Sequence, residues 1–548
     1  MKKLAIYLLA CVWITAGCND QFLDTYPKTQ INDDNFWKSP SDLMTYNNQL
    51  YGVYFKSQGF GGGGFNAKIL TDDNASDNSF AQTPDDTRLG LNTVNLPGRQ
   101  DWSWDLIRDI NQMLENSEAS SIEVLQKNPY IAEARLLRAL DYYDKLKLYG
   151  KLPIIDHVLT EEDPALYATQ ASRDEVMAFI KEDLDYAVEW MATSADANRF
   201  DKIIAEAYRA RIMLHEGTFR KYHGLGDEAS YLQAAAASAQ VVINSGRYII
   251  DASKGYNDLF SNIDLSGNKE VVFFKNYDEA LQLYNNVSNV LTHVDGAQFG
   301  GTKDLINDYL CVDGLPIDQS TLYQGDATIT QEFANRDGRL AGTFAQPNTY
   351  FVTDKLYIIG DPKGIVNTAS PSGYQVAKFY NEEMDQMASW DRAFTDAPLI
   401  RYAEVLLILA EAKAELGTIS QGDIDASINL LRAKAGVANL TLNPATIIAD
   451  VQRERRVELA FEGFRFDDLM RWKKGTKLSQ PVLGLKWNST DIANADDFVL
   501  GSQVNLNAAG YIISNQTYKF DESKNYYFPI PVNQLSLNPN LVQTEGWE

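Results

Sequence analysis

The strongest constraint on the fold is a helical hydrophobic periodicity that returns many times along the chain. Apolar residues recur at three- and four-residue spacing, which places them on one face of an α-helix. This spacing predicts helices over residues 42–54, 104–115, 132–149, 174–191, 202–216, 229–245, 403–416, 424–435 and 447–461. In the clearest of them, residues 132–149, the following Gly150 and Pro153 mark the end of the helix.

The predicted helices follow one another in pairs at about the period of tetratricopeptide repeats, although the spacing is irregular. Such pairs need small residues where the helices cross, and the alanine run 234–237 fits that need. We therefore predict a mainly α fold of irregular tetratricopeptide-like helical repeats. An unrelated helical bundle is the alternative.

Residues 248–399 differ in composition from the helical stretches. Glycine, aspartate, asparagine and aromatic residues are frequent, and the apolar runs are short, as at 271–274 and 357–359. This pattern predicts an inserted loop-rich, mixed α/β layer of loops, short strands and short helices. We expect one domain over residues 41–548, with repeat helices at about 41–247 and 400–473, the layer at about 248–399 and a loop-rich tail at 474–548.

The start of the chain predicts export and lipidation. Lys2 and Lys3 precede the apolar stretch 4–14, and small residues then lead to Cys18. This order resembles a bacterial lipoprotein signal, so we expect residues 1–17 to be removed, Cys18 to carry lipid and residues 18–40 to form a tether leading into the fold. An ordinary secretory signal or a single apolar helix is the alternative. No later stretch reaches the roughly 18 apolar residues of a membrane-spanning helix, so lipid would be the only anchor.

Net charge and cysteine usage limit the possible partners. The formal net charge is −25, which argues against nucleic acid and against direct adhesion to anionic lipid. A neutral ligand suits such a surface better than a polyanion. With Cys11 in the signal and Cys18 lipidated, only Cys311 remains, so no internal disulfide is expected.

Signatures of cofactor and metal enzymes are missing from the sequence. Gly59, Gly61 and Gly64 match the letters of a dinucleotide fingerprint, but no clear strand precedes them. The sequence contains no phosphate loop, no His-Glu-x-x-His and no Gly-x-Ser-x-Gly motif. No metal-ligand spacing links the four histidines, which are His157, His215, His223 and His293. We therefore expect no cofactor, no metal and no catalysis.

The most tempting pair of carboxylates for glycoside hydrolysis is Glu458 and Glu462, one helical turn apart. Four arginines surround them in the sequence, and arginine lowers the pKa of a nearby carboxyl, which weakens a general acid. We therefore interpret the pair as part of a structural ion-pair network with Arg453, Arg455, Arg456 and Arg465.

Five groups of segments carry a more specific signal. They are Phe22 to Asp24 with Pro27, Phe36 and Trp37; residues 132–139 and 148–153; residues 401–407 with 411–412; residues 453–469 with 471–472, the strongest match; and residues 527–531 with 538–541, Gln543 and 546–547. In this order, and over essentially the whole chain, they resemble the SusD/RagB family of Bacteroidetes nutrient-uptake lipoproteins.

The resemblance implies four irregular tetratricopeptide-like units that carry a loop-rich layer. It also implies a non-catalytic lipoprotein, anchored by lipid in the outer membrane and facing the cell exterior. Such a protein captures an oligosaccharide or polysaccharide and delivers it to a SusC-type TonB-dependent outer-membrane barrel. An oligopeptide-binding member of the family is the alternative, followed by a surface glycosidase and a protein-binding repeat scaffold.

The resemblance further implies a ligand surface built from loops outside the repeats, with aromatic rings and polar neighbours. Sugar C–H faces stack on such rings while amides and carboxylates bind the hydroxyls. By segment order, the first loop offers Asp77, Asn78 and Phe80, and the second offers Tyr284, Asn285 and Phe299. Trp102 and Trp390 are reserve candidates.

Overall fold

The structure is a computed structural model of the chain. It describes residues 36–61, 67–99, 101–194, 198–291, 299–346, 349–352, 355–357, 370–385, 391–488, 499–502 and 504–548. The predicted lipid site Cys18 and the reserve residue Trp390 lie outside these residues.

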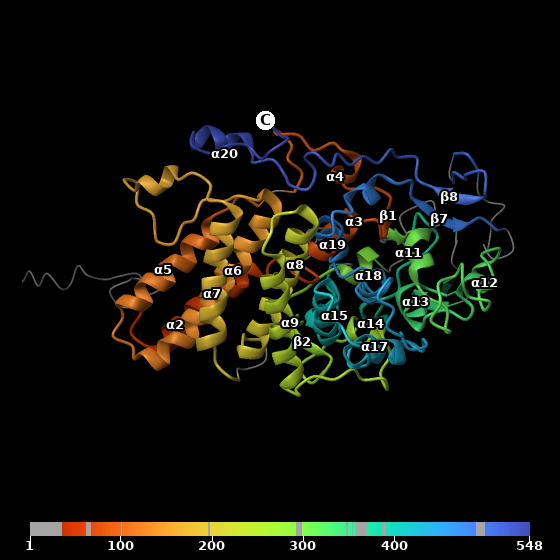
Figure 1. Cartoon of the computed structure of the whole chain (residues 1–548), viewed down its shortest axis with the longest axis horizontal. Coiled ribbons are helices and arrows are strands. Elements are labelled where there is room, and N and C mark those ends of the chain that lie inside the picture. Colours follow the sequence, from red (N-terminus) through yellow and green to blue (C-terminus); the bar gives the residue numbers. More distant parts are fainter. Residues whose placement is uncertain are drawn as a thin grey trace, which may run out of the picture.

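Long helices fill one half of the molecule and lie side by side (Figure 1). They are α2 (Pro40–Tyr54), α5 (Asp105–Ala119), α6 (Val124–Tyr149), α7 (Arg173–Trp190), α8 (Lys202–His223) and α9 (Glu228–Asn244). Neighbours in the sequence pack against each other, α6 against α7 and α8 against α9. α15 (Tyr402–Glu415) returns from late in the chain and packs on α8 and α9. The prediction of a mainly α, tetratricopeptide-like fold is confirmed.

Local sequence signals set several helix ends. α7 begins with a capping box, in which Ser172 Oγ accepts from the Glu175 N–H and the Glu175 carboxylate accepts from the Ser172 N–H. α6 ends at Gly150, which has a φ of 75°. That left-handed conformation favours glycine, so the predicted end of this helix is correct.

Several predicted helix boundaries differ from the structure. α8 and α5 run to His223 and Ala119, beyond the predicted ends at 216 and 115, and three further boundaries also differ. α6 begins at Val124, before the predicted start at 132, and contains Pro129. In its first turn, Lys127 Nζ donates to the Ser117 carbonyl 2.9 Å away, near the end of α5. The predicted helix 424–435 divides into α16 (Gln421–Asp425) and α17 (Ile428–Ala435), with Ser427 out of helical geometry between them.

The third difference concerns α18 (Ile447–Glu458), which ends before the predicted residue 461. Phe461 and Gly463 adopt positive φ values of 61° and 79°. A Cβ on Gly463 would lie 3.2 Å from the Ile69 Cα, so the close approach of α3 (Lys68–Asn74) requires a glycine there.

The other half of the molecule contains short elements and loops (Figure 1). The short helices of this half and of the rest of the chain are the following. They are α4 (Asp86–Leu89), η2 (Pro164–Tyr167), η3 (Asn257–Leu259), α10 (Val287–Leu291), α11 (Lys303–Asp308), α12 (Ile329–Phe333), α13 (Gly338–Thr343), α14 (Glu382–Asp385), α19 (Arg465–Arg471), η5 (Gly475–Ser479) and α20 (Val532–Leu537).

The strands pair two by two into antiparallel sheets. The pairs are β1 (Ser79–Ala81) with β3 (Phe299–Gly301), β2 (Val271–Lys275) with β6 (Ala397–Arg401), β4 (Thr349–Val352) with β5 (Lys355–Tyr357), and β7 (Leu483–Lys486) with β8 (Tyr511–Ile513). The apolar run 271–274 therefore forms a strand, as predicted. We call this region, residues 248–399 with the segments paired to it, the loop-rich layer.

Two hydrophobic cores meet at α18. The larger core lies between the long helices and includes Val451, whereas the second lies in the loop-rich layer and includes Val457. One helix thus buries a side chain in each core, which joins the layer to the repeats. Among the residues that the structure describes, no helix has both the length and the apolar character needed to span a membrane.

Candidate functional site

The first predicted ligand loop surrounds β1, and its polar residues are buried. Asp77 is 7% exposed, and its carboxylate accepts hydrogen bonds from Arg465 Nε and Nη2 at 2.6 and 2.9 Å. Burial raises the pKa of the Asp77 carboxyl, but Arg456 and Arg465 outweigh it and hold the pKa well below its usual range. Asn78 Oδ1 accepts from Arg456 Nε at 2.9 Å. Both side chains hold the loop against α18 and α19.

The two predicted phenylalanines face the core of the loop-rich layer. Phe80 and Phe299 lie on the paired strands β1 and β3, where Phe299 stands opposite Ala81. Their exposed fractions are 5% and 8%, and both belong to the second hydrophobic core. Each ring therefore contributes to packing between the two loops.

The second predicted loop has one ring that solvent reaches. Asn285 is fully buried and its Nδ2 donates to the Thr395 carbonyl at 3.1 Å. Tyr284 is half-buried, and the exposed Arg392 lies with its guanidinium carbon 5.8 Å from the ring centroid. Among the six predicted residues, Tyr284 is the one whose side chain is open to solvent, and a ligand role for the set stays a prediction.

The reserve residue Trp102 lies among the long helices. It is half-buried, and its ring meets Tyr149 edge-on with centroids 4.8 Å apart. This places it in the packing of the repeats, away from the loop-rich layer.

Glu458 and Glu462 belong to a buried ion-pair network, as predicted, but with other partners. Glu458 accepts from Arg339 Nη1 and Arg401 Nη1, each at 3.0 Å. Glu462 accepts from Arg401 Nε at 2.8 Å and from Lys378 Nζ at 2.7 Å. Burial raises the pKa of Glu458, yet Arg401 and Arg339 together keep it below its ordinary value. A carboxyl held ionised in this way is a poor general acid.

The four arginines expected around this pair have different partners, which corrects the sequence interpretation. They pair with acids outside it: Arg453 with Asp450, Arg455 with Asp468, Arg456 with Asp77, Asp304 and Asp308, and Arg465 with Asp77. Because side chains on one helix point in different directions, neighbours in the sequence reach partners on different elements. Arg339 and Arg401, the actual partners of Glu458, lie 119 and 57 residues away in the chain.

Asp73, on α3, is a buried carboxyl. Its Oδ2 accepts from the Gly463 N–H at 2.7 Å, while Oδ1 has no hydrogen-bond partner, and the carboxylate no cationic partner, among the residues that the structure describes. Burial raises the pKa of Asp73 to about 8, although the bond from Gly463 opposes the shift. At neutral pH this side chain is therefore mainly protonated.

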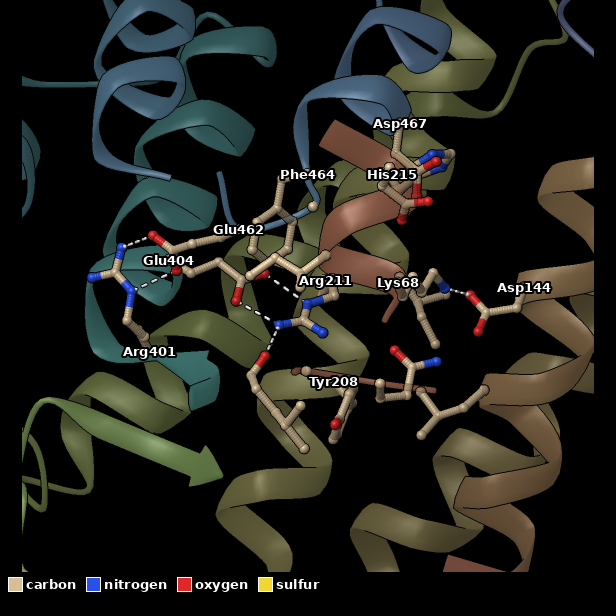
Figure 2. A pocket seen from close by; sticks show the side chains of 18 of the residues that line it. Lys68, Asp144, Tyr208, Arg211, His215, Arg401, Glu404, Glu462, Phe464 and Asp467 are labelled. Carbon is tan, nitrogen blue, oxygen red and sulfur yellow. Dashed lines mark hydrogen bonds and ion pairs between the residues drawn. The ribbon is translucent and has the colours of Figure 1, made fainter. Parts of the chain in front are cut away.

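An interior cavity of about 150 Å³ lies where the repeats meet the loop-rich layer (Figure 2). Side chains from α2, α3, α6, α8, α15 and α19 line it, among them Tyr54, Lys68, Asp144, Tyr208, Arg211, His215, Glu404, Phe464 and Asp467. This cavity is smaller than typical ligand pockets, which measure about 300–1,000 Å³.

The charges of the cavity neutralise one another. Arg211 and Glu404 form a two-point pair, with N–O distances of 2.7 and 2.6 Å. Lys68 pairs with Asp144 at 3.2 Å on the other wall (Figure 2). Burial lowers the pKa of His215 well below its usual value, so its imidazole is neutral at pH 7. Such matched pairs leave the cavity a structural feature.

A larger cleft of about 760 Å³ adjoins this cavity and shares Tyr54, Lys68, Asp144 and His215 with it. Its lining includes Arg99, paired with Asp72 at 2.7 Å, and Lys145, paired with Asp101 at 3.3 Å. Aspartates in the lining are twice as numerous as lysines and arginines. The cleft thus offers both donors and acceptors, an environment compatible with neutral polyhydroxyl ligands. Sequence reasoning missed it because no local motif marks its lining, which comes from segments far apart in the chain.

A metal centre is not apparent in the part of the chain that the structure describes. No group of three or more histidine, cysteine, aspartate or glutamate side chains there is arranged to hold a metal ion.

The fold and the sequence point to the same class of proteins. A SusD-like carbohydrate-binding protein of Bacteroides fragilis has the same fold. That structure superposes with a TM-score of 0.77 at 24% identity, over 92% of this chain and all of the other. A laminarin-binding SusD-like protein superposes with a TM-score of 0.64 at 19% identity, over 93% of this chain and all of the other.

Sequence comparison identifies the family. The model of the SusD family matches residues 269–547, just over half of the chain. A SusD-like protein of Formosa agariphila is 24% identical over 99% of both chains. The starch-binding protein SusD of Bacteroides thetaiotaomicron is 24% identical over 82% of this chain and 80% of its own length. The chain belongs to the SusD family.

Proposed function

We propose that this protein is a non-catalytic, cell-surface glycan-binding lipoprotein. It captures an oligosaccharide and delivers it to a SusC-type TonB-dependent barrel in the outer membrane. A lipid on Cys18 anchors it with the fold facing the exterior. Replacement of Cys18 by alanine should release the protein from membranes and abolish incorporation of labelled fatty acid.

The similarity to the starch-binding protein SusD, which extends over most of both chains, carries this proposal. Two structural neighbours, a carbohydrate-binding and a laminarin-binding SusD-like protein, support the same ligand class. Within the chain, Glu458 and Glu462 are both ion-paired, which favours binding without hydrolysis.

Ligand contact is proposed at the two loops that β1 and β3 bring together. Asp77, Asn78, Phe80, Asn285 and Phe299 fix the shape of this surface through their buried contacts. Tyr284 offers a ring for stacking, beside the exposed Arg392. A sugar on this ring would also meet polar groups of the neighbouring loops.

A glycan array probed with the purified protein tests the proposed ligand class. We expect retention of neutral glucans such as laminarin or starch oligosaccharides, with no shortened products after prolonged incubation. A blank array together with binding to an oligopeptide library would instead support the peptide-binding alternative. Product formation that disappears in a Glu458→Gln, Glu462→Gln variant would indicate a glycosidase.

Two variants separate the roles of the rings. Tyr284→Ala should weaken glycan binding by about ten- to a hundredfold, because a stacked ring contributes on the order of 1–3 kcal/mol. Phe80→Ala should instead lower the free energy of unfolding by about 3–5 kcal/mol, as expected for a buried phenylalanine. Calorimetric titration and urea unfolding measure the two effects. Unchanged affinity in a folded Tyr284→Ala variant would exclude this ring from the site.

A further inference from the structure

The cleft of about 760 Å³ is lined by other residues than the two predicted ligand loops. Its walls come from the end of α2, from α3, α6, α8 and α19, from residues 85–106, and from Tyr526 and Phe528 near the end of the chain. None of the six predicted ligand residues lines it. We call it the α6 cleft. Its volume falls within the range of about 300–1,000 Å³ that is typical of ligand pockets.

Every lysine and arginine in the lining of the α6 cleft already has an aspartate partner. The pairs are Lys68 with Asp144, Arg99 with Asp72, Lys145 with Asp141 and Asp101, and Lys147 with Asp144 and Asp467, at N–O distances between 2.7 and 3.3 Å. This ion-paired set contains four cations and five aspartates, so its net charge is close to zero. An anion or a cation that enters the cleft therefore meets groups of its own sign, which is unfavourable.

The polar groups outside the ion-paired set lie toward solvent. Asp86 and Asp105 are exposed and Asp85 is half-buried, and their carboxylates accept hydrogen bonds and oppose an anionic ligand. Ser57 and Ser103 are also exposed in the lining, and each hydroxyl can donate and accept. The α6 cleft thus offers donors and acceptors without presenting an unpaired cation.

Aromatic side chains form much of the apolar lining. They are Tyr54, Phe219, Phe466, Tyr526 and Phe528. The half-buried Tyr54 donates its hydroxyl to Asp144 Oδ2 at 3.1 Å, and the Arg99 guanidinium carbon lies 4.3 Å from the centroid of the Phe466 ring. Rings and charged groups therefore stand next to each other. Sugars combine apolar C–H faces with hydroxyls that donate to carboxylates and accept from ammonium groups, so they match such a lining.

We propose that the α6 cleft is a second saccharide site, which binds a short neutral oligosaccharide independently of the surface around Tyr284. The proposal rests on the proposed function, because glycan capture supplies the ligand class. A glycan long enough to reach both sites would be held more firmly than by either site alone, because binding at the first raises the effective concentration at the second.

Calorimetric titration of the full chain with laminaritriose, and separately with maltotriose, tests the number of sites. We expect two molecules of the bound trisaccharide per chain. Ser57→Trp should weaken one of the two sites by more than about tenfold, because the indole fills the cleft, and Ser103→Trp should do the same from residues 101–105. Ser41→Trp is the matched control, since Ser41 is exposed near the start of α2, outside the cleft, and should leave both sites unchanged.

His215 provides a signal from the cleft itself. It lines the α6 cleft, and its Nδ1 lies 2.7 Å from the Tyr143 hydroxyl, which fixes the orientation of the ring. The imidazole resonances of His215, assigned with the variant His215→Gln, should shift when laminaritriose is added to the parent or to Tyr284→Ala. The same resonances should not shift in Ser57→Trp.

The outcomes separate this inference from the proposed function. A single trisaccharide per chain that is lost in Tyr284→Ala and retained in Ser57→Trp, with unchanged His215 resonances, would overturn the second site and leave the proposed function intact. Loss of all binding in Ser57→Trp, with parental binding in Tyr284→Ala, would support the cleft and exclude the Tyr284 surface. If the folded parent binds neither trisaccharide, this inference fails together with the neutral-glucan ligand. Binding in the cleft of a glucosamine trisaccharide alone would overturn the neutral ligand class.

Discussion

The repeat helices and the loop-rich layer both combine an apolar core with buried ion pairs, but their contacts join residues at different separations along the chain. In the repeats, helices that follow one another in the sequence pack through apolar faces, as α8 does against α9. In the layer, buried ion pairs link residues that are far apart, as between Arg465 and Asp77, which are 388 residues apart. Periodicity therefore predicts the first region, whereas the second depends on contacts that appear only after the chain has folded.

Buried ion pairs have an energetic consequence in both regions. A buried charge that loses its partner keeps the whole cost of its desolvation. We therefore expect a substitution that breaks a buried ion pair to have a larger effect than one that breaks an exposed pair.

The largest effect is expected for Arg401→Leu. Arg401 bonds both Glu458 and Glu462, with its side chain only 3% exposed. Its removal leaves two buried carboxylates underpaired and should lower the free energy of unfolding by about 3–5 kcal/mol. Glu182→Gln is the control, since Glu182 is 74% exposed in its pair with Arg135 and such pairs contribute less than about 1 kcal/mol. Equal urea midpoints for the two variants would contradict the comparison.

A smaller effect is expected at a tight contact between two repeat helices. A Cβ on Gly217 of α8 would lie 2.8 Å from Leu232 Cγ and 3.0 Å from the Leu232 backbone nitrogen on α9. Gly217→Ala should therefore lower the free energy of unfolding by about 1–3 kcal/mol through overpacking. Gly52→Ala on α2 is the matched control, because nothing lies within 4 Å of the added Cβ. That control should raise stability by about 0.5–1 kcal/mol, since alanine favours helix.

A pH-dependent effect distinguishes unpaired from paired acids in the layer. The pKa of Asp73 is raised to about 8 by burial, so ionisation favours the unfolded state once pH exceeds the ordinary aspartate value. The stability of Asp73→Asn relative to the parent should therefore rise from about pH 4 to about pH 8, by at most about 1.4 kcal/mol per pH unit, and then level off.

In the same experiment, Asp77→Asn should change the stability of the fold in the opposite direction. The pKa of Asp77 lies well below its usual range, since Arg456 and Arg465 outweigh the effect of burial. Ionised Asp77 therefore stabilises the folded state at neutral pH, and the asparagine variant should be less stable than the parent there. Urea unfolding at a series of pH values measures both differences, and a flat profile for Asp73→Asn would contradict its assignment as an unpaired acid.

The helices of the repeats follow closely from the sequence. Predicted and observed limits of α2, α7, α9 and α15 differ by no more than a few residues, because apolar spacing and caps act within a few turns. The alanine run 234–237 was a weaker guide. Ala235 is fully buried and Ala237 is exposed, and α8 contributes a glycine, Gly217, at a tight contact with Leu232 of α9.

The loop-rich layer shows what sequence reasoning lacked. The sequence predicted an ion-pair network at Glu458 and Glu462, but the arginines assigned to that network were wrong, because adjacent side chains of α18 reach different elements. The sequence also suggested Phe80 and Phe299 as ligand residues from their position in a loop, whereas both rings lie in a hydrophobic core. The residue type alone does not show whether an aromatic ring faces solvent or packs against a neighbouring strand.

The repeat helices, the order of the family segments and the absence of common cofactor motifs can be predicted from the sequence, because each is recorded within short stretches of the chain. The folded structure is needed to show which charges pair, which of the predicted ligand residues solvent reaches, and where apolar side chains remain uncovered. Burial and pairing are properties of a residue's neighbours in space. For Arg456 with Asp77, or Val542 with Gln170, those neighbours lie more than 370 residues away in the chain.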